Sequence, residues 1–134
     1  MKRHEQALMF MQKAAEDETL VDEVLASRRV SDAIIGFHGQ QAAEKLLKAV
    51  LSEFGAEFRR THDLRELMDL LADAGHAVPK TLARLDFLTP YATLLRYEGI
   101  PARVPLNRRR ARSAIRRCRA WAEKQIGLSP GLFV

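Results

Sequence analysis

The segment from residue 32 to residue 54 constrains the fold more than any other, because its apolar residues recur at the spacing of an α-helix. Ser31 precedes the segment as a candidate N-cap, and Gly55 follows it as a natural helix terminator. The apolar stripe has to be buried against other helices, so the segment predicts a helical bundle. The expected core positions are Ile34, Phe37, Gln41, Leu47, Val50, Leu51 and Phe54.

Further segments show helical spacing, and none shows the strict alternation of a β-strand. We expect these helices over residues 4–25, 62–74, 79–95 and 108–126. Thr61 is expected to cap the helix that begins at residue 62. Pro90 should kink or split the helix over residues 79–95 near Thr89, because proline removes a backbone N–H and crowds the preceding turn. The sequence therefore predicts an all-α, antiparallel up-and-down bundle of about five helices.

The length of 134 residues suits one domain. We expect residues 1–126 to form the bundle, residues 96–107 to be a loop within it, and residues 127–134 to be a frayed tail. The first residues lack the pattern of a signal peptide, and no apolar run is long enough to span a membrane. A single cysteine, Cys118, excludes an intrachain disulfide. These features predict a cytoplasmic protein that does not contact a membrane.

Positive charge is concentrated near the end of the chain. Nine of the 22 lysines and arginines follow Gly99, together with only one of the 17 acidic residues. Most belong to the expected helix over residues 108–126, whose inner face is predicted to be Ala111, Ala114, Ile115, Cys118, Trp121 and Ala122. We predict a basic surface formed by Arg108, Arg109, Arg112 and Arg116. Such a surface is compatible with a solvated helix, with binding to the RNA backbone, or with docking of an acidic partner.

The stretch FHGQQAAEKLLKAVL, residues 37–51, places several polar groups within an apolar helix. A common helix face is expected for His38, Gln41, Lys45 and Lys48, which follow one another at spacings of three or four. In one interpretation they are structural groups satisfied by neighbouring helices, with Glu44 and Lys48 paired on a solvated face. In the other they form a groove floor, where the lysines contact phosphates and His38 and Gln41 bind a base or sugar.

Three motifs in this order resemble a HEPN domain, the higher-eukaryote and prokaryote nucleotide-binding domain. They are FHGQQAAEKLLKAVL at residues 37–51, THDL at residues 61–64, and Tyr91 followed by Arg96 and Tyr97. The resemblance extends from about residue 5 to residue 126. It implies an all-α up-and-down bundle, commonly a homodimer, and members often pair with a small nucleotidyltransferase as toxin and antitoxin. Several branches are metal-independent ribonucleases, whereas others bind nucleotides or act as non-catalytic partners.

The resemblance also directs attention to His62, Tyr91, Arg96 and Tyr97. His62 is either a hydrogen-bonding residue at a helix start or a site residue beside exposed N–H groups, able to donate a proton near neutral pH. Tyr91 either packs at the end of the bundle or offers a stacking face. Arg96 either forms a salt bridge or pairs with phosphate oxygens through its planar guanidinium group.

The ribonuclease branches carry an arginine followed at short spacing by a histidine, and this pair is missing here. The corresponding positions after Arg96 are Pro101, Ala102 and Arg103. No spacing typical of a metal site or a cofactor loop is present, so we predict no cofactor and no metal. The resemblance, together with the basic last helix, favours a nucleotide- or RNA-binding component of a two-protein module with a small nucleotidyltransferase. The alternatives are a metal-independent ribonuclease that uses His62 and Arg96, and a non-catalytic protein-interaction bundle.

Overall fold

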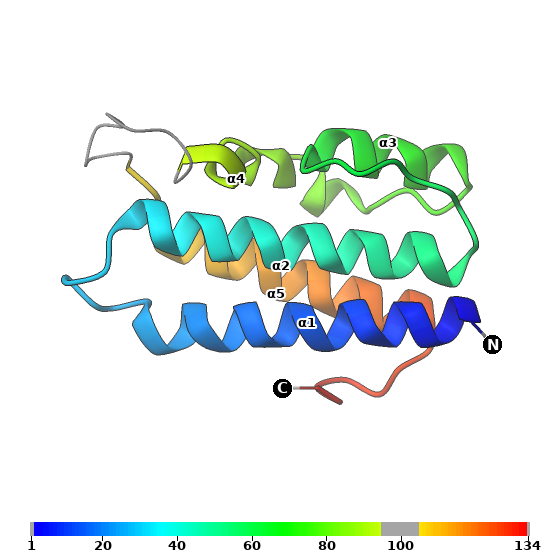
Figure 1. Ribbon diagram of the computed structural model, residues 1–134, viewed down its shortest axis with the longest axis horizontal. Coiled ribbons are helices and arrows are strands. Elements are labelled where there is room, and N and C mark those ends of the chain that lie inside the picture. The colour runs from blue at the N-terminus through cyan, green and yellow to red at the C-terminus, as the bar shows by residue number, and fades with distance from the viewer. Residues whose placement is uncertain (1, 95–104, 134) are drawn as a thin grey trace.

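The computed structural model describes residues 2–94 and 105–133, which form an all-α bundle, as the sequence predicts. The longest helices are α1 (Lys2–Val24) and α2 (Asp32–Glu53), which lie side by side in opposite directions (Figure 1). Helix α5 (Arg108–Ile126) packs against both. The remaining side of α2 is covered by α3 (Leu64–Asp73), the 3-10 helix η2 (Leu85–Leu88) and α4 (Tyr91–Leu94), whereas the 3-10 helix η1 (Lys80–Leu82) contacts α5.

Helix α2 is the centre of the bundle, and 14 of its 22 residues are buried. Its leucines Leu46, Leu47 and Leu51 are fully buried in the core, where each contributes about 1.5–3 kcal/mol relative to an exposed position. Because neighbours surround α2 on several sides, its buried positions do not form a single stripe. Two positions expected in the core, Ile34 and Phe54, are instead 40% and 39% exposed, near the two ends of the helix.

The caps of the helices follow from side chains at their starts. Ser31 caps α2, since its hydroxyl accepts a hydrogen bond from the N–H of Ile34 at 3.2 Å. The predicted Thr61 cap of α3 is wrong, because Asp63 occupies the cap position and its carboxylate accepts from two N–H groups of the first turn. Thr61 lies two residues too early, and its hydroxyl accepts from the N–H of Asp63.

The helix predicted over residues 79–95 is broken at Pro90, near Thr89 as expected, but the described residues on either side form shorter elements than predicted. Two short 3-10 helices and the single turn of α4 replace it. Pro90 lies between η2 and α4, where its ring and missing N–H interrupt regular hydrogen bonding. The side-chain hydroxyl of Thr89 accepts from the N–H of Leu64, so the break also joins this segment to the start of α3.

The end of the chain differs from the frayed tail that we expected. Helix α5 ends at Gly127, whose φ of 81° lies in the left-handed region that glycine adopts without strain. The N–H of Gly131 then donates to the Glu123 carboxylate at 3.0 Å. Phe133 is half-buried against the hydrophobic core. The segment after α5 therefore folds back onto the bundle as far as Phe133.

Gly36 allows α4 to approach α2 closely, because a β-carbon at this position would lie 2.3 Å from Cδ1 of Tyr91. Alanine ordinarily stabilises a helix by about 1 kcal/mol relative to glycine. Here we expect Gly36→Ala to lower the free energy of unfolding by about 1–3 kcal/mol, because the tyrosine ring has to move. Urea unfolding measures the change. Gly39→Ala is the matched control and should cost less, since its closest contact is the terminal methyl group of the Ile115 side chain at 3.1 Å. A Gly36→Ala protein as stable as the wild type would contradict the prediction.

Candidate functional site

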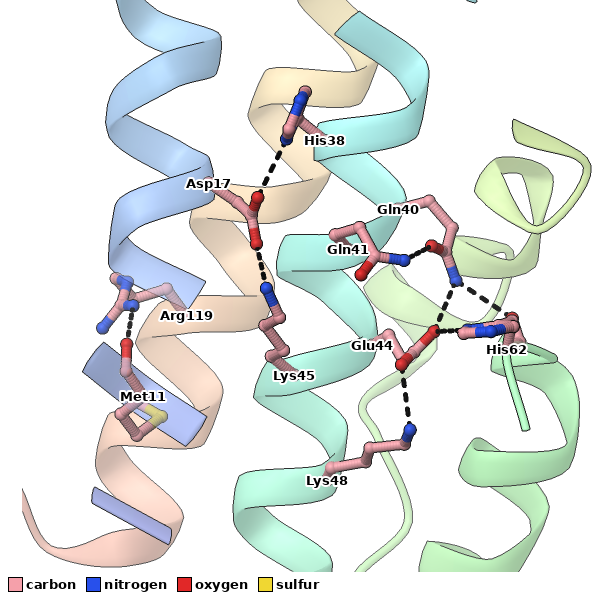
Figure 2. Close-up of polar contacts among 10 residues, drawn as sticks. All are labelled: Met11, Asp17, His38, Gln40, Gln41, Glu44, Lys45, Lys48, His62 and Arg119. Carbon is pink, nitrogen blue, oxygen red and sulfur yellow. Dashed lines mark hydrogen bonds and ion pairs between the residues drawn. The ribbon is translucent and has the colours of Figure 1, made fainter. Parts of the chain in front are cut away.

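A carboxylate of α1 holds two of the predicted site residues of α2 (Figure 2). Asp17 Oδ1 lies 2.9 Å from His38 Nδ1, and Asp17 Oδ2 accepts a hydrogen bond from Lys45 Nζ at 2.6 Å. The side chains of His38 and Lys45 are 29% and 24% exposed. Asp17 uses one ring nitrogen of the histidine and one of the three ammonium donors. The remaining polar groups of both side chains have no partner in the described part of the chain.

A second network is centred on Glu44, whose carboxylate is almost completely buried. Its Oε1 accepts from Gln40 Nε2 at 3.1 Å and lies 2.7 Å from His62 Nδ1. Its Oε2 accepts from Lys48 Nζ at 2.9 Å. Gln40 also donates to the His62 carbonyl oxygen at 3.0 Å and accepts from Gln41 Nε2 at 2.8 Å. The network therefore joins α2 to the loop before α3 (Figure 2).

The charge of Glu44 is stabilised by this network. Burial acts to raise the pKa of Glu44, but the hydrogen bonds from Lys48, His62 and Gln40 outweigh it and hold the pKa below its usual 4.5. Glu44 is thus ionised at neutral pH. Its charge balances the buried ammonium of Lys48, which also lies 5.7 Å from the ring centroid of Phe58. The pair that we expected on a solvated face is therefore an internal ion pair.

The predicted α2 residues do not gather on one face. His38 and Lys45 meet α1 through Asp17, whereas Gln41 and Lys48 belong to the Glu44 network with His62. Sequence reasoning missed the two carboxylates that organise them. Glu44 was visible only as the partner of Lys48 at a spacing of four residues. Asp17 gave no local signal, since its partners lie on another helix.

Tyr91 is a packed residue at the end of the bundle. It is 7% exposed, its ring lies against Gly36, and its hydroxyl donates to the carbonyl oxygen of Pro105 at 2.6 Å. Burial raises the pKa of Tyr91 above 10, so its hydroxyl remains protonated at neutral pH. The other two residues of this predicted cluster, Arg96 and Tyr97, lie outside the described residues.

The predicted basic surface on α5 is only partly correct. Arg112 is 7% exposed and pairs with the Asp22 carboxylate, to which its Nη2 donates at 2.9 Å. Arg108 donates to Asp32 at 2.7 Å and to three carbonyl oxygens of the loop between α1 and α2. Both arginines connect α5 to the bundle because acidic groups face them across the helix interface. Arg109 and Arg116 are exposed, and neither has an acidic partner in the described part of the chain.

A third arginine of α5 is also internal. Arg119 Nη2 donates to the carbonyl oxygen of Met11 at 2.9 Å (Figure 2). Its Nε donates to Glu18 Oε2 at 2.6 Å. Both side chains of this pair are almost fully buried. Burial raises the pKa of Glu18 despite the two nearby guanidinium groups of Arg119 and Arg112. These contacts assign Arg119 to the α1–α5 interface.

Cysteine and metal chemistry have no support in this geometry. Cys118 is fully buried, and this burial raises its pKa to about 12, so the thiol stays protonated at neutral pH. Within residues 2–94 and 105–133, no three histidine, cysteine or acidic side chains are grouped so as to hold a metal ion. No helix in the same ranges is long and apolar enough to cross a membrane.

The order of helices and the polar α2 agree with one protein family. A family model, the HEPN domain, matches residues 5–124. The chain belongs to the HEPN domain family. Comparison with curated proteins and with solved structures gave no match. Membership supports a role related to nucleotides or RNA, which directs attention to the oriented histidines and lysines of α2.

The buried charge of Glu44 should control the stability of this HEPN domain. Glu44→Gln leaves the Lys48 ammonium buried without a counter-charge, so we expect a loss of about 3–5 kcal/mol at pH 7 in urea unfolding. The double variant Glu44→Gln/Lys48→Met should recover much of this loss. Glu16→Gln removes an exposed acid from α1 and should change stability by less than about 0.5 kcal/mol.

The same substitution should change the pH dependence of unfolding. Because the folded-state pKa of Glu44 is lowered, its ionisation stabilises the fold fully above pH 4.5, and this contribution is lost as pH falls through the folded-state pKa. Glu44→Gln should therefore lose less stability than the wild type on acidification below that pH. Parallel curves for the two proteins would contradict the assignment.

Proposed function

We propose that this HEPN domain protein is a nucleotide- or RNA-binding component of a two-protein, toxin–antitoxin-like module, acting as a homodimer with a small nucleotidyltransferase partner. The cluster of Asp17, His38 and Lys45 carries the proposal. It holds an imidazole and an ammonium group on the two oxygens of one carboxylate, at a partly exposed position between two helices. Fixed polar groups lose less conformational entropy when a ligand binds.

The free atoms of this cluster suit the parts of a nucleotide. An imidazole that donates from Nδ1 to Asp17 presents Nε2 as an acceptor in its neutral form, which fits a sugar hydroxyl or an exocyclic amino group. The Lys45 ammonium keeps two donors for phosphate oxygens. Lys48 is less suited to this role, because it is buried and neutralised by Glu44.

The proposed partner rests on family membership and on the unmatched charges of α5. Arg109 and Arg116 are exposed on one side of this helix without acidic partners among the described residues. An acidic surface of a nucleotidyltransferase would be attracted to them. A small nucleotidyltransferase encoded by the adjacent gene supports the module, and its absence argues against that part of the proposal.

Lys45→Ala tests the binding site. We expect it to weaken the binding of nucleotide or RNA about tenfold, because a charge-assisted hydrogen bond to phosphate is lost. Fluorescence anisotropy with labelled single-stranded RNA, at two salt concentrations, measures the change. Lys13→Ala is the matched control, since it removes an exposed lysine of α1 that has no acidic partner in the described structure. Equal affinities for the two variants would refute ligand binding by the cluster of Asp17, His38 and Lys45, which we call the α2 site.

A second candidate function, a metal-independent ribonuclease, is favoured by one observation that the sequence did not offer. Glu44 orients His62 through Nδ1, and His62 is 37% exposed with no protein partner at Nε2 among the described residues. A carboxylate-oriented imidazole of this kind can take up a proton from a ribose hydroxyl. The phosphate-stabilising role would then fall to Arg96.

Cleavage of end-labelled RNA in excess chelator tests this candidate. If the protein is a ribonuclease, the wild type cleaves, and His62→Gln and Arg96→Ala each lose activity by at least about a hundredfold. Glutamine can retain the hydrogen bond to Glu44, so the loss would report proton transfer rather than unfolding. Intact RNA at high wild-type concentration would reject the ribonuclease and leave the binding role.

A further inference from the structure

A cavity of about 300 Å³ lies between α5 and the segment that contains η1 and η2. On α5 its wall consists of Arg110, Ala114 and Arg117, which share one helix face at spacings of four and three residues. On the opposite side it is lined by Lys80 and Arg84. The cavity is separate from the Asp17 and Glu44 clusters, none of whose residues contributes to its lining.

The charges around this cavity are unbalanced. Four cationic side chains line it, and no aspartate or glutamate does. Asp86, which belongs to η2 but does not line the cavity, is paired with Arg65 at 3.1 Å. The side chains of Lys80 and Arg84 form no hydrogen bond or ion pair in the described part of the chain, and Arg117 donates to the neutral hydroxyl of Ser113. The cavity therefore concentrates positive potential in a concave space.

This pattern contrasts with the other arginines of α5. Arg108, Arg112 and Arg119 each face a carboxylate of α1 or α2. The lining arginines have no such partner, although they belong to the same helix. Ion pairs within the bundle therefore explain the arginines on one side of α5. They do not explain the arginines that line the cavity.

Arg110 is already held in an orientation that suits a phosphate. Its guanidinium carbon lies 4.1 Å from the ring centroid of Phe87, which also lines the cavity. Contact with an aromatic ring restricts an arginine while leaving its N–H donors available at the edge of the guanidinium plane. A planar set of donors matches two oxygens of a phosphate group.

Apart from Thr81, the remaining lining residues are apolar. Leu82 and Leu85 are at most 2% exposed, and Ala114 is 5% exposed. Their burial in the core fixes the wall that carries the cations. A volume of about 300 Å³ is at the small end of ligand pockets. This size suits one nucleotide unit rather than a folded domain.

We propose that this cavity binds a phosphate group of a nucleotide, either free or within an RNA strand. The anion pocket follows from the cavity and its four unmatched cations. The choice of a nucleotide over other phosphate compounds rests on the proposed function. An acidic protein segment is less suited, because carboxylates would have to enter a small concave space, whereas phosphate fits the arginine donors directly.

Charge reversal at the cavity rim tests the proposal. The double variant Lys80→Glu/Arg84→Glu changes two exposed side chains that form no hydrogen bond or ion pair within the described residues. The matched control is Arg28→Glu/Arg29→Glu, which changes the net charge equally in the exposed loop between α1 and α2. Anisotropy with labelled single-stranded RNA should show at least about tenfold weaker binding for the cavity variant, and less than about threefold for the control. Thermal unfolding of all variants verifies that they are folded.

Competition experiments identify the ligand chemistry. Inorganic phosphate and AMP should displace RNA from the wild type, and this competition should disappear in the Lys80→Glu/Arg84→Glu protein. A much stronger effect of AMP indicates a free nucleotide, whereas equal and weak effects indicate the phosphate backbone of RNA. Equal losses for the cavity and control variants, no displacement by phosphate, or displacement by polyglutamate as effective as by RNA would each overturn the proposal.

Comparison of Lys45→Ala with the cavity variant distinguishes binding at the cavity from binding at the α2 site. If Lys45→Ala has no effect while the cavity variant loses affinity, the Asp17 cluster is excluded and the phosphate pocket stands. The converse result excludes the pocket and leaves the α2 site in place.

Discussion

The burial of α2 on several sides is the constraint on which the rest of the structure depends. A helix that contacts α1, α3, α4 and α5 has little surface left for its own polar residues. Glu44 and Lys48 are nevertheless inside, so each must find a counter-charge and hydrogen bonds there. Gln40 and His62 complete these bonds, and the loop before α3 is thereby fixed to the middle of α2. The position of His62, and any chemistry it performs, is a consequence of satisfying one buried carboxylate.

The interface between α1 and α5 also contains buried charges, but their hydrogen bonds are less complete than those of Glu44. Glu18 and Arg119 form a buried pair, yet Oε1 of Glu18 and Nη1 of both Arg112 and Arg119 have no hydrogen-bond partner among the described residues. The desolvation penalty of burying two charges offsets much of their Coulombic attraction. The raised pKa of Glu18 reflects that penalty. We infer that these ion pairs mainly set the position of α5 along α1. A shift of α5 along α1 would leave several charges buried without partners, so the pairs favour one arrangement of the two helices.

The sequence predicted the all-α class and most long helices, because spacing and caps such as Ser31 are local properties of the chain. It failed where distant groups decide the outcome. The break near Thr89 was expected from Pro90, but no local pattern reveals that two 3-10 helices replace the helix before it, or that Thr89 accepts a hydrogen bond from Leu64. Arg112 was assigned to a basic surface because Asp22, its partner, is separated from it by most of the chain. The sequence could suggest candidate site residues by their side-chain type, whereas the carboxylates that orient them became visible only in three dimensions.

The number of arginines in α5 is therefore a poor guide to where a polyanion would bind. An arginine matched by a buried carboxylate has already exchanged its hydration for a protein contact, and a phosphate would have to compete with that contact. An arginine without such a partner keeps its donors available, and its charge is strengthened by like charges around a concave wall. In this HEPN domain the two kinds alternate along a single helix, since the helical repeat turns successive arginines toward α1, toward solvent and toward η1. The place where a polyanion would bind on α5 would then depend on which faces the acids of α1 and α2 leave unmatched.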